Sequence, residues 1–142
     1  MKKKMIIERT KKGFPALWES GGGYTNTGEA LIVADAQGKP KKPIYVRRRG
    51  HLANAAHALF VVEKGDIIVD CNHHREDFEG GVYKIVDFLE EDGYEYAVLE
   101  RLHYHSKGEW DTEPLEKYQD AIDASAEKAT CYHCREPHYI LE

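Results

Sequence analysis

The chain has 142 residues, of which 20 are Lys or Arg and 25 are Asp or Glu, and its formal net charge is −5. This length fits a single domain, residues 1–142, with one core. No run of about 18 apolar residues is present, and the apolar segment after the first lysines is too short for a signal peptide, so we expect a cytoplasmic protein with no membrane partner. Three cysteines cannot all pair within one molecule, which argues against a secreted disulfide framework.

The net charge hides an asymmetry along the chain. Residues 1–49 contain 12 basic and 4 acidic residues, a balance of +8, whereas residues 50–142 contain 8 and 21, a balance of −13. Two interpretations are open: the oppositely charged parts pack together in one fold, or the basic part meets an anion such as phosphate or nucleic acid.

The first third of the chain contains two predicted strands and a glycine-rich loop. Residues 1–13 are lysine-rich and would form either a basic arm or an edge strand. Three glycines at 21–23 exclude a regular element, and the loop after them is either a plain connection or a binding loop with Tyr24 and Asn26. β-Branched residues predict strands over 30–34 and 44–49.

The middle of the chain predicts two β-hairpins within a β-rich core, residues 30–105. The first has one helical turn over 52–56, then strands over 58–62 and 67–71 joined by Glu63-Lys64-Gly65-Asp66. The second has strands over 82–89 and 94–105 joined through Asp92-Gly93, a strong hairpin signal. Strict alternation of side chains would put Leu99, Arg101, His103 and His105 on one face.

The last part predicts one helix over 112–129, opened by Thr112 as a cap and Pro114 in the first turn. Residues 130–142 form a Cys-x-x-Cys knuckle and a tail. The fold class is therefore α+β: a mainly antiparallel sheet curled into a small barrel or sandwich, with one C-terminal helix.

The most specific local motif is Cys131-x-x-Cys134, which can supply two thiolates to a tetrahedral ion. Cys71 and His73, predicted on one face of a strand end, would complete a structural zinc site. The remaining histidines that compete for the fourth position are His74, His133 and His138. A redox pair and three unrelated thiols are the other interpretations of these cysteines.

A second histidine cluster lies near the end of the last predicted strand. The order His103-x-His105-x3-Glu109 resembles the metal-ligand order of a cupin motif, which implies a metal site built from two imidazoles and a carboxylate. The framing glycines and the second histidine motif of that family are absent. Exposed histidines at a strand end are the ordinary alternative.

The best candidate for anion binding surrounds the arginine run. Arginine's planar fork suits phosphate, and a tyrosine can stack on a base. The predicted ligand-binding residues are Tyr24, Asn26, Tyr45, Arg47, Arg49, His51 and His74. The alternative is that these arginines pair with the acidic second part of the chain.

The sequence therefore predicts a non-catalytic binding module for a phosphate-bearing ligand, either a nucleotide-like small molecule or a short single-stranded nucleic acid, with a structural zinc. One alternative is a metal-dependent hydrolase or oxygenase that uses His73 or His74 with the cupin-like residues. Another is a self-assembling protein-interaction domain, which would be a homo-oligomer.

Overall fold

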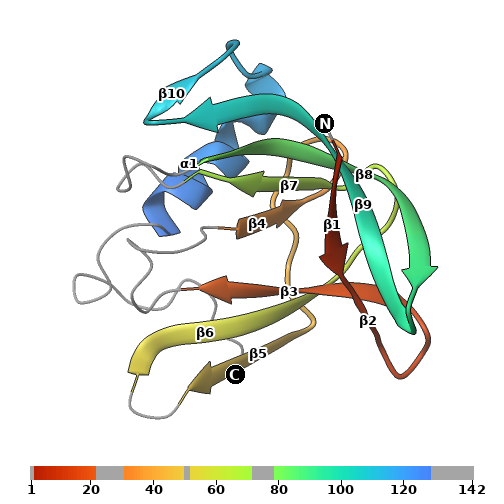
Figure 1. The fold of residues 1–142 in the computed structure, drawn as a ribbon. Coiled ribbons are helices and arrows are strands. Elements are labelled where there is room, and N and C mark those ends of the chain that lie inside the picture. The colour runs from red at the N-terminus through yellow and green to blue at the C-terminus, as the bar shows by residue number, and fades with distance from the viewer. Residues whose placement is uncertain (1, 22–30, 50–51, 72–78, 129–142) are drawn as a thin grey trace.

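The computed structural model describes residues 2–21, 31–49, 52–71 and 79–128, which form two antiparallel sheets and one α-helix (Figure 1). Sheet A has the strand order β1-β9-β8-β7-β4, with β10 paired to β9, and sheet B has the order β2-β3-β6-β5. The strands of sheet A are β1 (Lys2–Ile6), β4 (Leu31–Ala34), β7 (Ile67–Asp70), β8 (Glu79–Glu91), β9 (Tyr94–Ser106) and β10 (Glu109–Trp110). The strands of sheet B are β2 (Glu8–Arg9), β3 (Pro15–Gly21), β5 (Tyr45–Arg49) and β6 (Leu52–Val61).

The predicted class is confirmed at the level of a mainly antiparallel α+β fold with one short C-terminal helix, α1 (Gln119–Lys128). The predicted barrel is wrong. In the described part of the chain each sheet has two open ends, β1 and β4 in sheet A and β2 and β5 in sheet B, so neither closes on itself. The Cys131-x-x-Cys134 knuckle lies outside the described residues.

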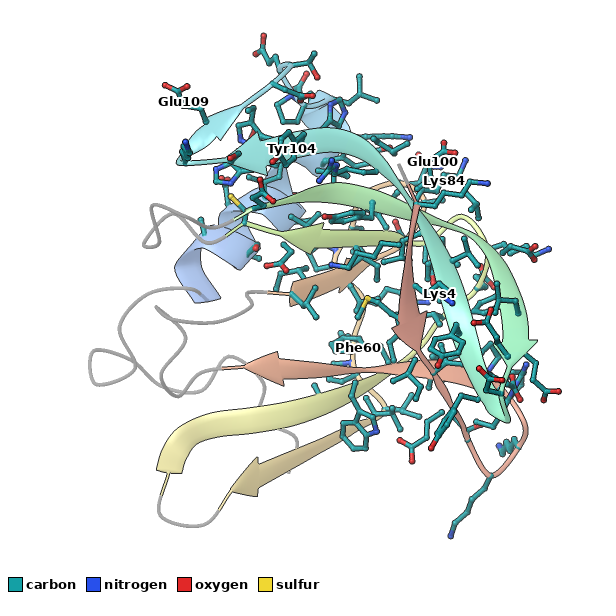
Figure 2. All side chains as sticks on the ribbon, viewed as in Figure 1. Lys4, Phe60, Lys84, Glu100, Tyr104 and Glu109 are labelled. Atoms are coloured by element: carbon teal, nitrogen blue, oxygen red, sulfur yellow. The ribbon has the colours of Figure 1, made fainter. Side chains whose placement is uncertain are left out.

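Apolar side chains collect in two layers, one on each face of sheet A. The first layer lies between the sheets and contains Leu17 and Phe60 from sheet B with Ile85 and Leu99 from sheet A. Figure 2 shows Phe60 in this position. The second layer lies between sheet A and the C-terminal segment, where α1 contributes Ala121 and Ile122. Sheet A is therefore buried on both faces, which explains why β4 and β7 are apolar at every position except Asp70.

The chain passes between the sheets at several points, and one of them corrects the predicted first hairpin. The turn at residues 63–66 is present, since the Asp66 amide donates to the Glu63 carbonyl over 3.1 Å. However, β6 before it pairs with β3 and β5, whereas β7 after it pairs with β4 and β8. The turn therefore joins two sheets, and the predicted pairing of residues 58–62 with 67–71 is wrong.

Residues 52–56, predicted as a helical turn, belong to strand β6. Alanine has the highest intrinsic helix propensity, but this preference is small beside tertiary pairing. Here the backbone of this segment pairs with β5, where Arg49 lies opposite Leu52 and Arg48 opposite Ala56. Tertiary pairing has overridden the local preference.

The second predicted hairpin is confirmed as β8 and β9. Asp92 and Gly93 both have positive φ, 53° and 82°, as a two-residue turn of the type that matches strand twist requires. Lys107 and Gly108 repeat this geometry, with φ of 55° and 81°, between β9 and β10. Figure 1 shows the long β8–β9 hairpin curving down beside β1 and β2.

A bulge in β9 breaks the predicted alternation of its side chains. Val82 pairs with His103 but Tyr83 pairs with Arg101, so Leu102 is an extra residue in β9. Leu99 lies in the layer between the sheets, whereas the rings of His103 and His105 contact Tyr118 and Trp110 on the helix side. The expectation that His103 and His105 share a face with Leu99 is wrong, although the two histidines do lie on the same side.

The helix begins later than the sequence predicts. Trp110 belongs to β10, and a 3-10 turn (Glu116–Tyr118) precedes α1, which begins at Gln119. Thr112 is no helix cap, because its amide and hydroxyl are bonded to the Asp111 carboxylate in the turn after β10.

The charge asymmetry is used in part for internal pairing. Among the described residues, three of the four ion pairs join a base from the first 49 residues to an acid further on. These pairs are Lys4–Glu91, Arg9–Glu95 and Lys41–Asp66. The interpretation that the oppositely charged parts attract each other within one fold is supported for these residues.

Candidate functional site

A cavity of about 610 Å³ lies where the N-terminal strand passes from one sheet to the other. Such a volume falls within the usual range of small-molecule sites. Its lining comes from segments far apart in the sequence, namely β1, β2, β3, the start of β4 and the start of β9. The lining residues are Lys3, Lys4, Met5, Ile6, Ile7, Glu8, Trp18, Leu31 and Tyr94.

The cavity exists because β1 is an edge strand that changes sheets. β1 pairs with β9 in sheet A, and after Ile7 the chain continues as β2, which pairs with β3 in sheet B. Ile7 is buried in the core at this crossing, and its amide donates to the Glu95 carbonyl over 2.9 Å. In the described part of the chain β1 pairs with β9 alone, so its other edge faces the cavity region.

The floor and the rim of the cavity differ in chemistry. Leu31 and Ile7 are buried and give an apolar floor. Ile6 and Tyr94 are exposed large apolar side chains at the rim. Half-buried Trp18 adds a second aromatic ring, and its indole N–H donates to the Glu8 carboxylate. An aromatic rim over an apolar floor suits a ligand with a flat ring.

Two lysines bring positive charge to this cavity in different ways. Lys4 is exposed and forms an ion pair with Glu91 at 3.1 Å, and its Nζ lies 5.1 Å from the centre of the Tyr96 ring. Lys3 is half-buried, with its Nζ 5.0 Å from the centre of the buried Tyr83 ring. Within the described residues no carboxylate forms an ion pair with Lys3, so its charge is available to an anion.

The sequence-predicted ligand residues are only partly placed. Tyr24, Asn26, His51 and His74 lie outside the described residues. Tyr45, Arg47 and Arg49 are described as backbone of β5, the end strand of sheet B, and the pairing register with β6 shifts between Arg48 and Arg49. The predicted arginine site therefore stays a prediction.

Of the predicted zinc ligands, the structure describes Cys71 alone. Its side chain is buried in the layer between sheet A and α1, and its backbone amide donates to the Ser125 hydroxyl over 2.8 Å. Burial, together with the neighbouring Asp70 carboxylate, raises the pKa of the Cys71 thiol to about 12. Zinc would bind the thiolate form of Cys71, and a bound zinc ion itself favours deprotonation of its thiol ligands. His73, Cys131 and Cys134 lie outside the described residues, so the zinc site stays a prediction.

The cupin-like residues do not assemble a metal site. His103, His105 and Glu109 are all described, and no group of three His, Cys, Asp or Glu side chains that could hold a metal occurs in residues 2–21, 31–49, 52–71 and 79–128. His105 is instead buried with its ring 4.8 Å from that of Trp110. Figure 2 shows Glu109 at the outer end of this strand pair.

His103 belongs to a short polar chain at the surface. Its Nδ1 lies 3.2 Å from the Thr112 hydroxyl, which donates to Asp111 over 3.3 Å. Hydrogen bonds from the Tyr104 and Thr112 amides, aided by His103, hold the pKa of the Asp111 carboxyl below its ordinary value. These bonds fix the turn after β10, which gives the group a structural role.

The cavity residues could not be predicted from the sequence, because they come from segments that are far apart along the chain. The lysines at 2–4 were recognised as a possible edge strand, but nothing local connects them to Trp18 or Tyr94. Only the pairing of β1 with β9 and of β2 with β3 brings these residues together. The one available signal was aromatic residues in otherwise polar surroundings at both positions.

The fold and the cavity define a two-sheet α+β protein with a ligand-sized site at the crossing between its sheets. No protein-family model matches the chain, and comparison with curated proteins and with solved structures finds no match either. Among the described residues, no helix combines the length and the apolar character needed to cross a membrane.

Proposed function

We propose that the protein is a non-catalytic binding module that captures a phosphate-bearing ligand with a flat ring, and that this ligand occupies the cavity beside β1. The observation that carries the proposal is the lining of the cavity, in which two aromatic residues accompany Lys3 and Lys4, and of these two lysines Lys3 forms no ion pair within the described residues. Trp18 or Tyr94 would stack on the ring, and a lysine of β1 would neutralise the phosphate.

The charge pattern favours a compact anion over a nucleic-acid duplex. Binding to a duplex depends on a broad basic surface that neutralises several phosphates, whereas this chain has a net charge of −5. Two lysines in one cavity match a nucleotide or a short single strand. The arginines of β5 would provide a second contact if the ligand is a strand longer than one nucleotide.

Thermal shift and fluorescence titrations test this proposal. We expect AMP, ADP or ATP to raise the unfolding midpoint with increasing ligand concentration, reaching about 2.7 kcal/mol of stabilisation at 100 times the dissociation constant. The two tryptophans are Trp18 and Trp110, so in a Trp110→Phe background the same ligand should change the emission of Trp18 alone. Adenosine and inorganic phosphate, used separately, report the ring and phosphate contributions.

Variants of two lysines identify the site. Lys3→Ala should weaken binding about 10- to 100-fold, because it removes a charge-assisted contact worth about 1.5–3 kcal/mol. Lys84→Ala is the matched control, since Lys84 is an exposed lysine of β8 that does not line the cavity (Figure 2). Equal binding by both variants would remove the cavity as the site, and loss of binding in Arg47→Ala/Arg49→Ala alone would assign the ligand to β5.

A structural zinc held by Cys71, His73, Cys131 and Cys134 remains a separate part of the proposal, supported by the Cys-x-x-Cys spacing. Metal analysis of protein purified without chelator should find about one zinc per chain. If zinc persists at the same level in Cys71→Ala, then the buried thiol is no ligand and another histidine completes the site.

A further inference from the structure

A second apolar groove lies on the outer face of sheet B, beside the turn between β2 and β3. It has a volume of about 430 Å³ and contains two strongly exposed apolar side chains, Phe14 at 52 % and Ile44 at 53 % exposure. The residues that line it are Thr10, Lys11, Lys12, Phe14, Ile44 and Val61. Val61 alternates with the core residues Phe60 and Val62, which places the groove on the face turned away from the core.

The exposure of Phe14 is a property of an ordered turn. The Thr10 amide donates to the Phe14 carbonyl over 2.9 Å, and the Phe14 amide donates to the Thr10 hydroxyl over 3.1 Å. Arg9 donates to the Gly13 carbonyl over 3.0 Å and pairs with Glu95 at 2.8 Å, which anchors the turn to the start of β9. Figure 1 shows this turn at the lower right of the view, beside the tip of the β8–β9 hairpin. The hydrogen bonds of this turn therefore hold Phe14 in an exposed position.

The charge around the groove is of one sign. Lys11 and Lys12 line it, Lys42 stands two residues before Ile44, and no acidic residue contributes to the lining. All three lysines are exposed, and within the described residues none of them forms an ion pair. The groove lining thus combines two exposed apolar side chains with two lysines, and the nearby connector adds a third exposed lysine, Lys42.

We propose that this groove and the turn beside it form a contact site for an anionic lipid surface. Phe14 and Ile44 would enter the boundary between headgroups and acyl chains, and the three lysines would lie among the headgroups. Flexible ammonium groups suit the diffuse charge of a bilayer, and a protruding turn reaches a flat surface more readily than it encloses a peptide. Stable association with a membrane needs both an apolar and an electrostatic contribution, and the groove offers both.

This inference concerns peripheral contact and departs from the sequence-based expectation of no membrane partner. That expectation depended on the absence of a long apolar segment. Phe14 and Ile44 lie 30 positions apart, and they meet only because β3 and β5 both flank β6.

Sedimentation with vesicles tests the proposal. The full chain should bind vesicles of 70 % phosphatidylcholine and 30 % phosphatidylserine, should bind pure phosphatidylcholine much less, and should lose binding to the anionic vesicles as salt increases. Lys11→Ala/Lys12→Ala should weaken the partition coefficient about 30-fold, since each lysine near an anionic surface contributes about 1 kcal/mol, or about fivefold. Phe14→Ala should weaken it about tenfold.

Two controls separate the groove from general surface effects. Leu115→Ser removes an exposed apolar side chain and Lys84→Ala removes an exposed lysine, both outside the groove, and both variants should bind vesicles as the wild type does. Lys3→Ala should also bind normally, so failure here is distinguishable from failure of the proposed cavity ligand. No preference for anionic vesicles, or unchanged binding by Phe14→Ala, would overturn the proposal. A concentration-dependent dimer that Phe14→Ala abolishes would also overturn it, because the groove would then be occupied by a second copy of the chain.

Discussion

The ion pair formed by Lys41 and Asp66 is the least exposed of the four among the described residues. Lys41 Nζ lies 2.8 Å from Asp66 Oδ2 and also donates to the Val61 carbonyl over 2.7 Å, while the Glu63 amide donates to the same Asp66 oxygen over 2.9 Å. The Asp66 side chain is 3 % exposed and that of Lys41 is 25 % exposed. The pair therefore ties the connector before β5 to the turn that carries the chain from sheet B to sheet A.

We predict that Lys41→Met destabilises the protein by about 2–4 kcal/mol. Removing one partner of a buried pair costs about 3–5 kcal/mol, because the other charge is left uncompensated, and the partial exposure of Lys41 reduces this figure. For a chain of this size the unfolding midpoint would fall by about 10 °C. Urea and thermal unfolding, followed by circular dichroism, measure the change.

Two further variants separate charge from packing. Lys41→Met/Asp66→Asn should recover part of the lost stability, since the amide of Asn still accepts from Glu63 but carries no charge. Lys64→Met breaks the exposed pair with Asp87, 3.3 Å apart, and should leave the midpoint nearly unchanged. If Lys41→Met and Lys64→Met were equivalent, or if the double variant were less stable than Lys41→Met, the reasoning about burial would be refuted.

Three other predictions concern single positions. Gly38→Ala should destabilise the protein by about 3 kcal/mol or more, because Gly38 has φ of +83° and an added Cβ would lie 1.9 Å from the Lys117 carbonyl oxygen. Gly13→Ala is the control, since Gly13 has φ of +87° but open space around it, and this variant should cost only about 1 kcal/mol. Thermal unfolding distinguishes the two variants. The raised pKa of Cys71 means that the protonated thiol makes its full contribution to stability below its ordinary pKa of 9.0, and that this contribution is lost as the pH rises towards about 12. In native protein at pH 8, iodoacetamide followed by mass spectrometry should find Cys71 unmodified until urea is added. Rapid labelling of the native protein would contradict the burial of Cys71. The lowered pKa of Asp111 contributes stability that is present above its ordinary pKa of 3.8 and is lost as the pH falls through its pKa in the folded protein. Asp111→Asn should therefore flatten the acid side of the plot of unfolding free energy against pH. An unchanged plot would show that the hydrogen bonds of Asp111 contribute nothing to stability.

Local turn chemistry made the β8–β9 hairpin predictable. Asp92-Gly93 readily adopts the positive φ values of a two-residue turn, and the flanking residues alternate. The same kind of signal at residues 63–66 led to a wrong strand pairing. Such a signal marks a turn, but it does not say whether the strands before and after the turn pair with each other. Phe60 and Ile68, on either side of that turn, both enter the core between the sheets, and this tertiary burial set the pairing.

The remaining errors have equally local causes. Thr112 resembles a helix cap in sequence. In the structure its amide donates to the Asp111 carboxylate in the turn that follows β10, so the helix does not begin there. The prediction for β9 assumed that side chains alternate strictly between the two faces of the sheet, and this assumption cannot include the bulge at Leu102. The bulge places His103 and His105 on the helix side of sheet A.

The location of the candidate site could not be predicted from the sequence, and its ligand class stays a prediction. Charge asymmetry and aromatic residues indicated an anion-binding function, but Lys3, Trp18 and Tyr94 lie in three separate segments that only strand pairing brings together. The residues emphasised by the sequence are either outside the described part or, in β5, described as backbone only. The proposal therefore depends on tertiary structure for its location and on residue chemistry for its ligand class.

Amide and indole chemical-shift mapping with AMP tests the central claim most directly. The account predicts that isotope-labelled protein titrated with AMP shows saturable shifts of the β1 amides and of the Trp18 indole N–H, and that Lys3→Ala abolishes these shifts while Lys84→Ala keeps them. Saturable shifts confined to β5, or no shifts at millimolar AMP, would contradict it.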